Sequence, residues 1–201
     1  MKRLLLRLLV VALSSAVPVL RAAETAAAPA PAAAPTPGVD DPGKLLPANP
    51  PAGKALAEKL AGFERTTGMR MLLRFQPKSP TTDEDKVPGA YMRALASRLG
   101  TAQRGALVVY FADEDDWRVW IGDVCTPAFA GRPGSAKELT ESGAIHQAKE
   151  TLLAAARAAG DATFAAARKS APSDRPPSAA EHLRLQADAL LDGLITRLAP
   201  H

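Results

Sequence analysis

The chain has 201 residues, of which 25 are Lys or Arg, 21 are Asp or Glu and one is Cys. A single cysteine excludes an intrachain disulfide framework, so the folded part depends on its hydrophobic core. Four of the basic residues lie within residues 1–22, which hold no acidic residue, so the rest of the chain has 21 basic and 21 acidic residues, and no nucleic-acid partner is expected.

The first 22 residues are typical of a signal peptide or membrane anchor. Lys2, Arg3 and Arg7 form a basic start, and residues 8–20 are an uncharged stretch of 13 residues, which is short for a membrane span. Small residues offer cleavage after Ala16 or near residues 22–23. The segment predicts export to the periplasm or beyond. Membrane contact is transient if the segment is removed, and residues 4–20 form a tether if it is not.

Residues 23–53 are rich in Ala and Pro and nearly free of large apolar side chains. Such a segment buries too little surface to offset the entropy cost of ordering, which predicts a linker. We expect one domain over residues 54–170 and a helical extension over residues 171–201. This length supports one hydrophobic core and not two.

Hydrophobic periodicity predicts the first elements of the domain. Residues 54–67 have apolar side chains at helical spacing and end before Gly68. Residues 69–75 alternate between apolar and polar, which predicts a strand. After a polar, Pro-bounded loop, a helix is expected over residues 90–99. Residues 106–112 have no polar interruption, which is typical of a strand covered on both faces. Strand, helix and strand in this order predict a parallel pair.

A four-residue acidic run, residues 113–116, leads into the next element. Residues 116–122 alternate again, which predicts a strand that returns antiparallel through a short hairpin. Trp117 and Trp120 lie three residues apart on this strand, so their side chains face opposite sides. Core packing is expected for both.

Two helices complete the pattern. A long helix is expected to begin at Ser135, with Glu138 completing a capping box, or at Thr140. It is interrupted at Gly160–Asp161. A last amphipathic helix begins at Ser178, and its apolar stripe must pack on the domain or meet a partner. The predicted fold class is α/β: a small mixed sheet, made of a parallel βαβ pair plus an antiparallel hairpin strand, sandwiched by helices, with a C-terminal amphipathic helix.

The acidic residues could form a divalent-metal site. Calcium takes about six to eight oxygen ligands. Several could come from five carboxylates if the hairpin tip and the start of the long helix converge: Asp113, Asp115, Asp116, Asp123 and Glu141. The alternative is a solvated acidic turn, the commoner outcome for such a run. We therefore expect weak or no binding of calcium or another divalent metal.

The order of elements and several short motifs resemble the TPM domain. Over residues 54–170 the similar pieces are Gly100 and Gly105, the strand Ala106–Phe111, Arg118-Val119 and Ile121-Gly122 in the returning strand, Leu139-Thr140-Glu141, and Gly160-Asp161 followed by Phe164. The resemblance implies a small mixed sheet between helices, an exported envelope protein, and the phosphatase activity claimed for the family. The family has Asp-Asn where this chain has Gln103-Arg104, so the fold transfers better than the chemistry.

Two functions are therefore expected from the sequence. The first is an exported, TPM-like envelope module that binds an unidentified envelope protein, through the hairpin tip and the last helix, without catalysis. The second is a divalent-metal-dependent phosphatase of the TPM type, in which a bound metal activates water. Its ligands would be Asp113, Asp116, Asp123 and Glu141. The first is preferred, because the acidic motif that the phosphatase needs is incomplete.

Overall fold

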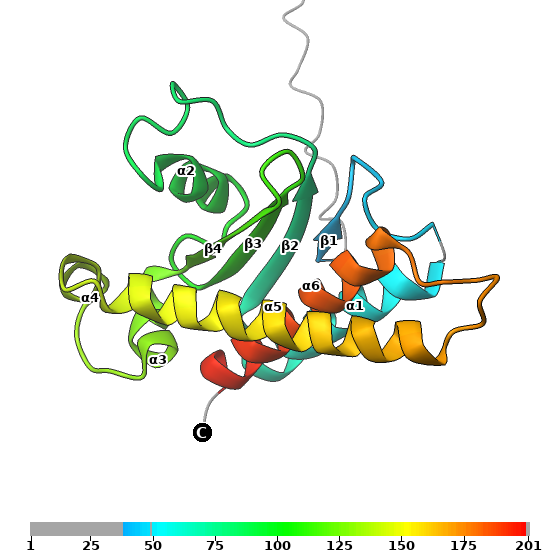
Figure 1. Ribbon diagram of the computed structural model, residues 1–201. Helices are drawn as coiled ribbons and strands as arrows, with labels where there is room; N and C mark the ends of the chain where they lie inside the picture. Colours follow the sequence, from blue (N-terminus) through cyan, green and yellow to red (C-terminus); the bar gives the residue numbers. More distant parts are fainter. Residues whose placement is uncertain (1–37, 49, 200–201) are drawn as a thin grey trace, which may run out of the picture. The chain divides into compact units, whose positions relative to one another are not determined.

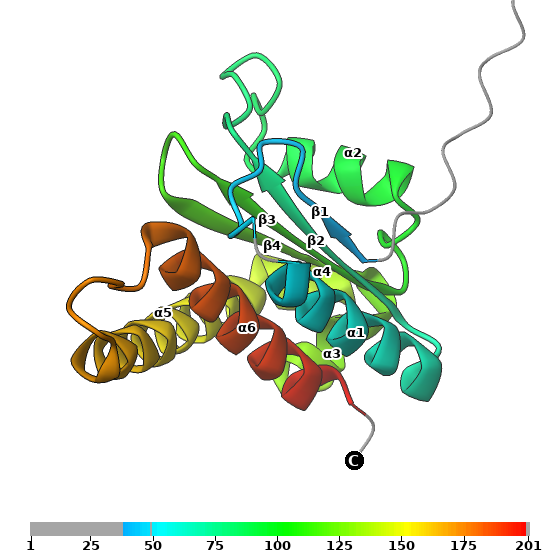
Figure 2. The ribbon, with the colours of Figure 1, turned by 90° about the vertical axis from the view of Figure 1, so that its right-hand side faces the viewer.

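The computed structural model describes residues 38–48 and 50–199. The predicted signal peptide or anchor and most of the predicted linker lie outside these residues. The described residues form a four-stranded sheet with helices on both faces (Figures 1 and 2). This confirms the α/β class predicted from the sequence pattern.

The sheet has the strand order β1-β2-β3-β4. β1 (Val39–Asp40) pairs parallel to β2 (Arg70–Gln76), and β2 pairs parallel to β3 (Gly105–Phe111). β4 (Asp116–Ile121) returns antiparallel to β3 through the loop 112–115. The predicted parallel pair and the hairpin strand are confirmed, and β1 and β4 are the edge strands of the described sheet.

Alternation along the strands assigns each side chain to one of two cores. In β3, which is buried at every residue, Val108 faces the larger core and Leu107 the smaller one. In β4, Trp117 faces the larger core and Trp120 packs against the smaller one, as their spacing predicts. Trp117 is buried, whereas Trp120 is only partly buried.

Helices cover the two cores unequally. α2 (Ala90–Arg98) packs on the smaller core, while α1 (Pro50–Thr67), α5 (Ala144–Ser170) and α6 (Ala179–Leu198) enclose the larger one (Figure 2). Between β4 and α5 the chain forms the 3-10 helix η1 (Asp123–Cys125) and the short helices α3 (Thr126–Ala130) and α4 (Ala136–Glu141). None of the helices in the described part of the chain has both the length and the apolar character that crossing a membrane requires.

The linker assignment is wrong at its C-terminal end. The main chain of β1 pairs with β2, and Leu73 N donates a 2.8 Å hydrogen bond to Gly38 O. Arg74 also forms an ion pair with Asp40 across these two strands. α1 begins within the predicted linker as well, at Pro50. A strand of two residues has too little periodicity to be recognised in an Ala/Pro-rich segment.

The predicted long helix is two helices. Ser135 caps α4 as predicted, because its side-chain oxygen accepts a hydrogen bond from Glu138 N, and the Glu138 carboxylate accepts one from Ser135 N at 2.8 Å. α4 then ends at Glu141. Gly143, in the left-handed region at φ 74°, turns the chain before α5 begins.

The interruption predicted at Gly160 is also wrong, because α5 continues to Ser170. Gly160 has a different role: a Cβ atom there would lie 2.8 Å from the Cα of Gln186 in α6. The missing side chain therefore lets two helices approach closely without ending either of them.

α6 belongs to the larger core and not to a separate extension. Ser178 caps it, accepting a 3.2 Å hydrogen bond from Glu181 N. Five of its side chains are buried in the larger core: Ala187, Leu190, Leu191, Leu194 and Leu198. Lys59 of α1 also bonds two α6 carboxylates, Asp188 at 2.5 Å and Asp192 at 2.6 Å. The last helix therefore packs on the domain, which resolves the alternative left open by the sequence.

Candidate functional site

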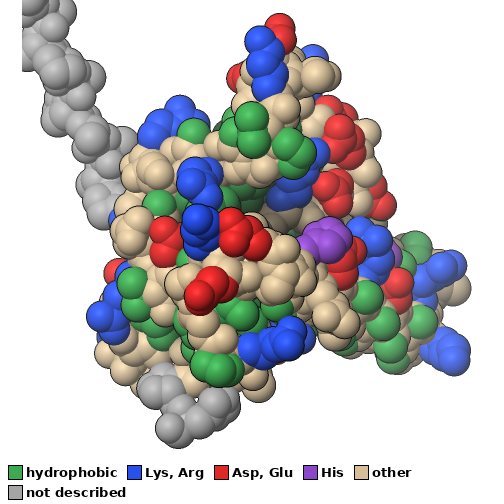
Figure 3. Space-filling view, turned by 90° about the vertical axis from the view of Figure 1, so that its left-hand side faces the viewer, with side chains coloured by type: hydrophobic (Ala, Val, Ile, Leu, Met, Phe, Trp, Pro, Cys, Tyr) green, Lys and Arg blue, Asp and Glu red, His purple; other side chains and the backbone are tan. Residues whose placement is uncertain are grey.

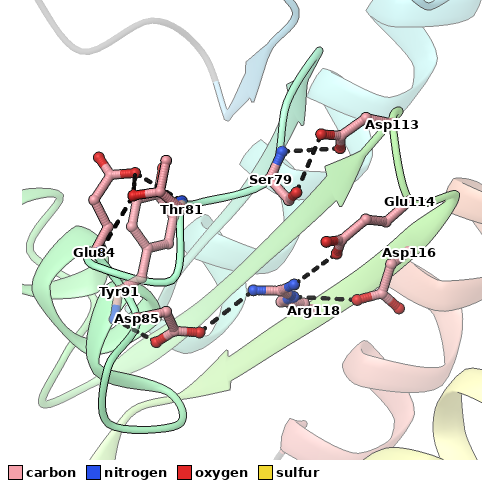
Figure 4. Close-up of polar contacts among 9 residues, drawn as sticks. All are labelled: Ser79, Thr81, Glu84, Asp85, Tyr91, Asp113, Glu114, Asp116 and Arg118. Carbon is pink, nitrogen blue, oxygen red and sulfur yellow. Dashed lines mark hydrogen bonds and ion pairs between the residues drawn. The ribbon is translucent and has the colours of Figure 1, made fainter.

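Two carboxylates of the acidic hairpin are hydrogen-bonded to protein groups. Asp113 accepts hydrogen bonds from Ser79 N at 2.8 Å and from Ser79 Oγ at 3.1 Å (Figure 4). Asp115, at φ 50°, accepts one from the Tyr110 hydroxyl at 2.8 Å. Burial, followed by this hydrogen bond and the charge of Asp115, raises the pKa of Tyr110 from 10.0 to about 12.

Arg118 is the cation of the acidic hairpin. Its guanidinium contacts Glu114 at 2.8 Å, Asp116 at 3.1 Å and Asp85 at 3.5 Å (Figure 4). It also lies 4.8 Å from the centre of the Phe111 ring. Burial alone lowers the pKa of Arg118, but the hydrogen bonds and charges of Asp116 and Glu114 outweigh it and raise that pKa. One positive charge thus contacts three carboxylates and offsets part of their combined negative charge.

The loop 77–89 is attached to β4 through the same cluster. Asp85 accepts a 3.1 Å hydrogen bond from Tyr91 N while it contacts Arg118 (Figure 4). Within the loop, Glu84 accepts hydrogen bonds from Thr81 N at 2.8 Å and Thr81 Oγ1 at 2.9 Å, which lower the pKa of the Glu84 carboxyl. The loop is therefore positioned by hydrogen bonds over the strand that Arg118 belongs to.

The other two residues of the predicted metal site lie elsewhere. Asp123 begins η1 after the far end of β4, whose six residues span about 20 Å. It accepts a 3.3 Å hydrogen bond from Gln103. Glu141 lies on α4 and pairs with Lys137 at 3.8 Å on the exposed surface.

The expected convergence of the hairpin tip with the helix start is therefore not found. The structure does not bring together the five carboxylates of Asp113, Asp115, Asp116, Asp123 and Glu141, because β4 separates the hairpin from Asp123. Among the described residues, no group of three or more His, Cys, Asp or Glu side chains could hold a metal ion.

A groove of ≈ 380 Å³ lies beside β4, between α2 and α5. Met92 of α2 and residues 116–120 of β4 form one part of its lining. Side chains along α5 form the other: His146, Lys149, Glu150, Leu153, Ala154 and Arg157. Figure 3 shows this side of the molecule, where charged side chains of both signs border a hollow. We call this feature the β4 groove; its volume lies in the range of ligand sites, about 300–1,000 Å³.

Backbone groups of β4 face this groove. In an antiparallel pair, opposite residues alternate between hydrogen-bonded and non-hydrogen-bonded positions. Gly122 N donates to Gly105 O at 2.9 Å, so the alternation places Trp117 and Val119 in the non-hydrogen-bonded class. Their N–H and C=O groups therefore point away from β3. Among the described residues, no backbone group from another segment is hydrogen-bonded to them.

Lys149 gives the groove a partly buried positive charge. Its ammonium lies 5.7 Å from the centre of the Trp120 ring, and the guanidinium of Arg93 lies 5.3 Å from the same ring. Both distances are within the range of cation–π attraction. Burial lowers the pKa of Lys149, and no described carboxylate forms an ion pair with it. The indole nitrogen of Trp120 is buried without a described hydrogen-bond partner.

The α5 wall of the groove was not recognised in the sequence, although a signal exists. His146, Lys149, Leu153 and Arg157 recur at the spacing of one helical face. This face adjoins the buried stripe of α5, to which Leu152 and Ala156 belong. A stripe that mixes basic and apolar residues beside a buried stripe indicates a helix that lines a groove.

No protein-family model matches this chain, and no curated protein matches it either. Among solved structures, the chain is similar to the N-terminal domain of a protein from P. gingivalis, determined in solution by NMR. That match has a TM-score of 0.43 and 16% sequence identity, and covers 83% of this chain and 87% of that chain. A similarity at this level assigns neither a family nor a function.

Proposed function

We propose that this chain is an exported, TPM-like module of the cell envelope that acts by binding another envelope protein and does not catalyse a reaction. The β4 groove is the observation that carries the proposal. It combines an edge strand whose outward backbone groups have no described partner with apolar and charged side chains from α2 and α5. Such an edge is a common surface for recognising a segment of another protein.

The binding surface proposed here differs from the one expected from the sequence. The apolar stripe of α6, with Leu190 and Leu194, is buried in the larger core and is not available to a partner. At the hairpin tip, Asp113 and Asp115 already accept hydrogen bonds from protein groups. The β4 groove, in contrast, has backbone hydrogen-bonding groups without described partners, and a cation, Lys149, without a described ion-pair partner.

The export part of the proposal is supported by residues 1–22, with their basic start and uncharged stretch. The protein would then work in the periplasm or another exported location, with residues 4–20 as a tether if cleavage does not occur. N-terminal sequencing of the protein recovered from the envelope tests this. A start after Ala16 or near residues 22–23 is expected for a cleaved signal peptide. An intact N-terminus in the membrane fraction would favour the tether, and recovery from the cytoplasm would contradict export.

Site-specific photo-crosslinking in cells tests the binding function. A photoreactive phenylalanine derivative replaces Ala154, which lines the β4 groove and is exposed. The matched control replaces Ala166, which is exposed on the same helix about 18 Å further along. We expect a discrete adduct with an envelope protein at Ala154 and not at Ala166. No adduct at Ala154 from a folded, exported chain would contradict the proposal.

The metal-dependent phosphatase that the TPM resemblance also implies has less support from the positions of its ligands. Its four ligands lie on three separate parts of the molecule, the hairpin, η1 and α4, and Asp116 is paired with Arg118. A direct assay distinguishes the two functions: release of phosphate from an aryl phosphate, with and without added divalent metal. Metal-dependent turnover that is lost in Asp116→Ala would overturn the non-catalytic proposal.

A further inference from the structure

The outer edge of β4 has the geometry that an added strand requires. Trp117 and Val119 are two residues apart, so their outward backbone groups repeat at about 7 Å, the spacing of hydrogen-bond pairs between neighbouring strands. The groove is lined on one face of the sheet by α5, with Lys149 and Leu153, and on the other by α2, with Met92. An extended chain beside β4 would therefore have α5 on one face and α2 on the other.

The groove can also accept the side chains of such a strand. Successive side chains of a strand point to opposite faces of the sheet. In the β4 groove one set would lie toward Met92 of α2 and the other toward Leu153 of α5, and both of these lining residues are apolar. This arrangement favours a segment with β-branched or other apolar residues at alternate positions.

The charges of the groove favour an acidic residue in the bound segment. Lys149 and Arg157 lie on the α5 wall without a described ion-pair partner. Glu150 lies on the same wall but is exposed, and Asp116 is already bonded to Arg118 at 3.1 Å. Burial removes part of the water that stabilises the charge of Lys149. A carboxylate of the bound segment would replace that water and stabilise the charge by an ion pair.

From this geometry and charge we infer that the β4 groove binds an extended segment of a partner protein as an additional strand on β4, and that an acidic side chain of this segment pairs with Lys149. The inference rests on the proposed function, because it describes how the partner is held. It defines the partner's chemistry as an exposed, strand-forming segment that contains Asp or Glu.

Three peptide pools test the inference with the purified full chain. They are labelled, N-acetylated nonapeptides whose central residue is Glu, Gln or Lys and whose other positions are drawn from Val, Ile, Thr and Ser. Fluorescence polarisation measures their binding. We expect the Glu pool to bind about tenfold more tightly than the Lys pool. N-methylation of alternate peptide amides should abolish binding, because it removes the donors for the β4 carbonyl groups.

The tryptophans provide a second readout, since Trp117 and Trp120 are the two tryptophans of the chain and both line the groove. Binding of the Glu pool should change their fluorescence. Lys149→Glu should reverse the preference in favour of the Lys pool, and Lys149→Gln should remove it. Lys169→Glu makes the same charge change at an exposed position near the end of α5, and should leave the preference unchanged.

The outcomes separate this inference from the proposed function. A reversed preference in Lys149→Glu, with Lys169→Glu unchanged, supports the acidic strand. An unchanged preference in Lys149→Glu overturns the role of Lys149, and equal binding of N-methylated peptides overturns strand addition. If no pool binds but Ala154 still forms its adduct in cells, the inference fails and the binding function stands. If neither occurs, both fail.

Discussion

The side chain of Arg118 connects two separate segments of the chain, because it contacts carboxylates from both. Glu114 and Asp116 belong to the hairpin, whereas Asp85 belongs to the loop 77–89. The Arg118 side chain is only partly exposed, so water screens these contacts less than those of a surface pair. Its removal would leave three carboxylates close together without a counter-charge.

Arg118→Gln should therefore lower the free energy of unfolding by about 1–2 kcal/mol, allowing for partial screening of these contacts. Chemical denaturation measures this change. Added calcium should stabilise this variant more than the wild type, because the uncompensated carboxylates gain a counter-ion. Lys137→Gln is the matched control, since it breaks an exposed pair with Glu141 and should cost less than about 0.5 kcal/mol. Equal effects of the two substitutions would refute the role given to Arg118.

Tyr110 provides a residue-scale prediction about pH. Its pKa of about 12 in the folded chain lies above the ordinary value of 10.0. The neutral phenol therefore contributes stability that is present below pH 10 and is lost as the pH rises from about 10 to about 12. We expect the wild type to lose stability over this range more steeply than Tyr110→Phe, as measured by denaturation at each pH.

The same titration can be followed directly by tyrosinate absorbance. Tyr91→Phe leaves Tyr110 as the one tyrosine, because the chain has two. In this background Asp115→Asn should lower the pKa of Tyr110, since it removes the charge of the hydrogen-bond acceptor. Asn also tolerates the φ of 50° at this position. An unchanged titration in Asp115→Asn would show that the Asp115 charge has no part in the shift.

At the scale of elements, strong periodicity allowed accurate prediction from the sequence. β2, β3 and β4 were found within one or two residues of their observed ends, because alternating or continuous apolar runs define them. α2 and the cap of α4 at Ser135 were also predicted, because helical spacing and a capping box are patterns of neighbouring residues. β1 was missed because a strand of two residues is too short to show an alternating pattern in the sequence.

Predictions failed where a tertiary contact decided the outcome. Gly160 was expected to interrupt a helix, but the close approach of Gln186 explains the glycine. The candidate metal site, at which weak or no binding was expected, required the hairpin tip and the start of the long helix to converge, and the direction of β4 takes Asp123 to the far end of the strand. The β4 groove was missed because no single segment forms it: α2, β4 and α5 each contribute part of the lining.

Gly160→Ala tests the packing of α5 against α6. A methyl group there would approach backbone atoms of Gln186 to 2.8 and 2.9 Å, and helix backbones cannot yield as a flexible side chain can. We expect a loss of about 1–3 kcal/mol in the free energy of unfolding. Gly62→Ala in α1 is the control, because its nearest neighbour would be an Arg65 side-chain nitrogen at 3.9 Å. That substitution should stabilise by about 0.5–1 kcal/mol. Stabilisation in both variants would contradict the close approach of the helices.

At the scale of the whole molecule, α6 determines whether the larger core is closed. Its buried side chains lie in the same core as Phe75 of β2 and Leu56 of α1, and Lys59 joins α1 to Asp188 and Asp192. α6 is therefore part of the larger core, although it follows a polar, Pro-rich connection in the sequence. A partner-binding experiment based on removing α6 would test folding before it tested binding.

Deletion of residues 178–201 should therefore abolish cooperative unfolding and not merely a binding activity. The deletion exposes the apolar side chains that α6 covers, and each large side chain costs about 1.5–3 kcal/mol when it is exposed. The total cost for several such side chains exceeds the free energy of unfolding of an ordinary small domain. Thermal melting followed by circular dichroism measures the outcome. Deletion of residues 200–201 alone leaves α6 intact and should melt like the wild type. A cooperative transition near the wild-type midpoint in the longer deletion would mean that α6 is dispensable for the core, contrary to the packing described.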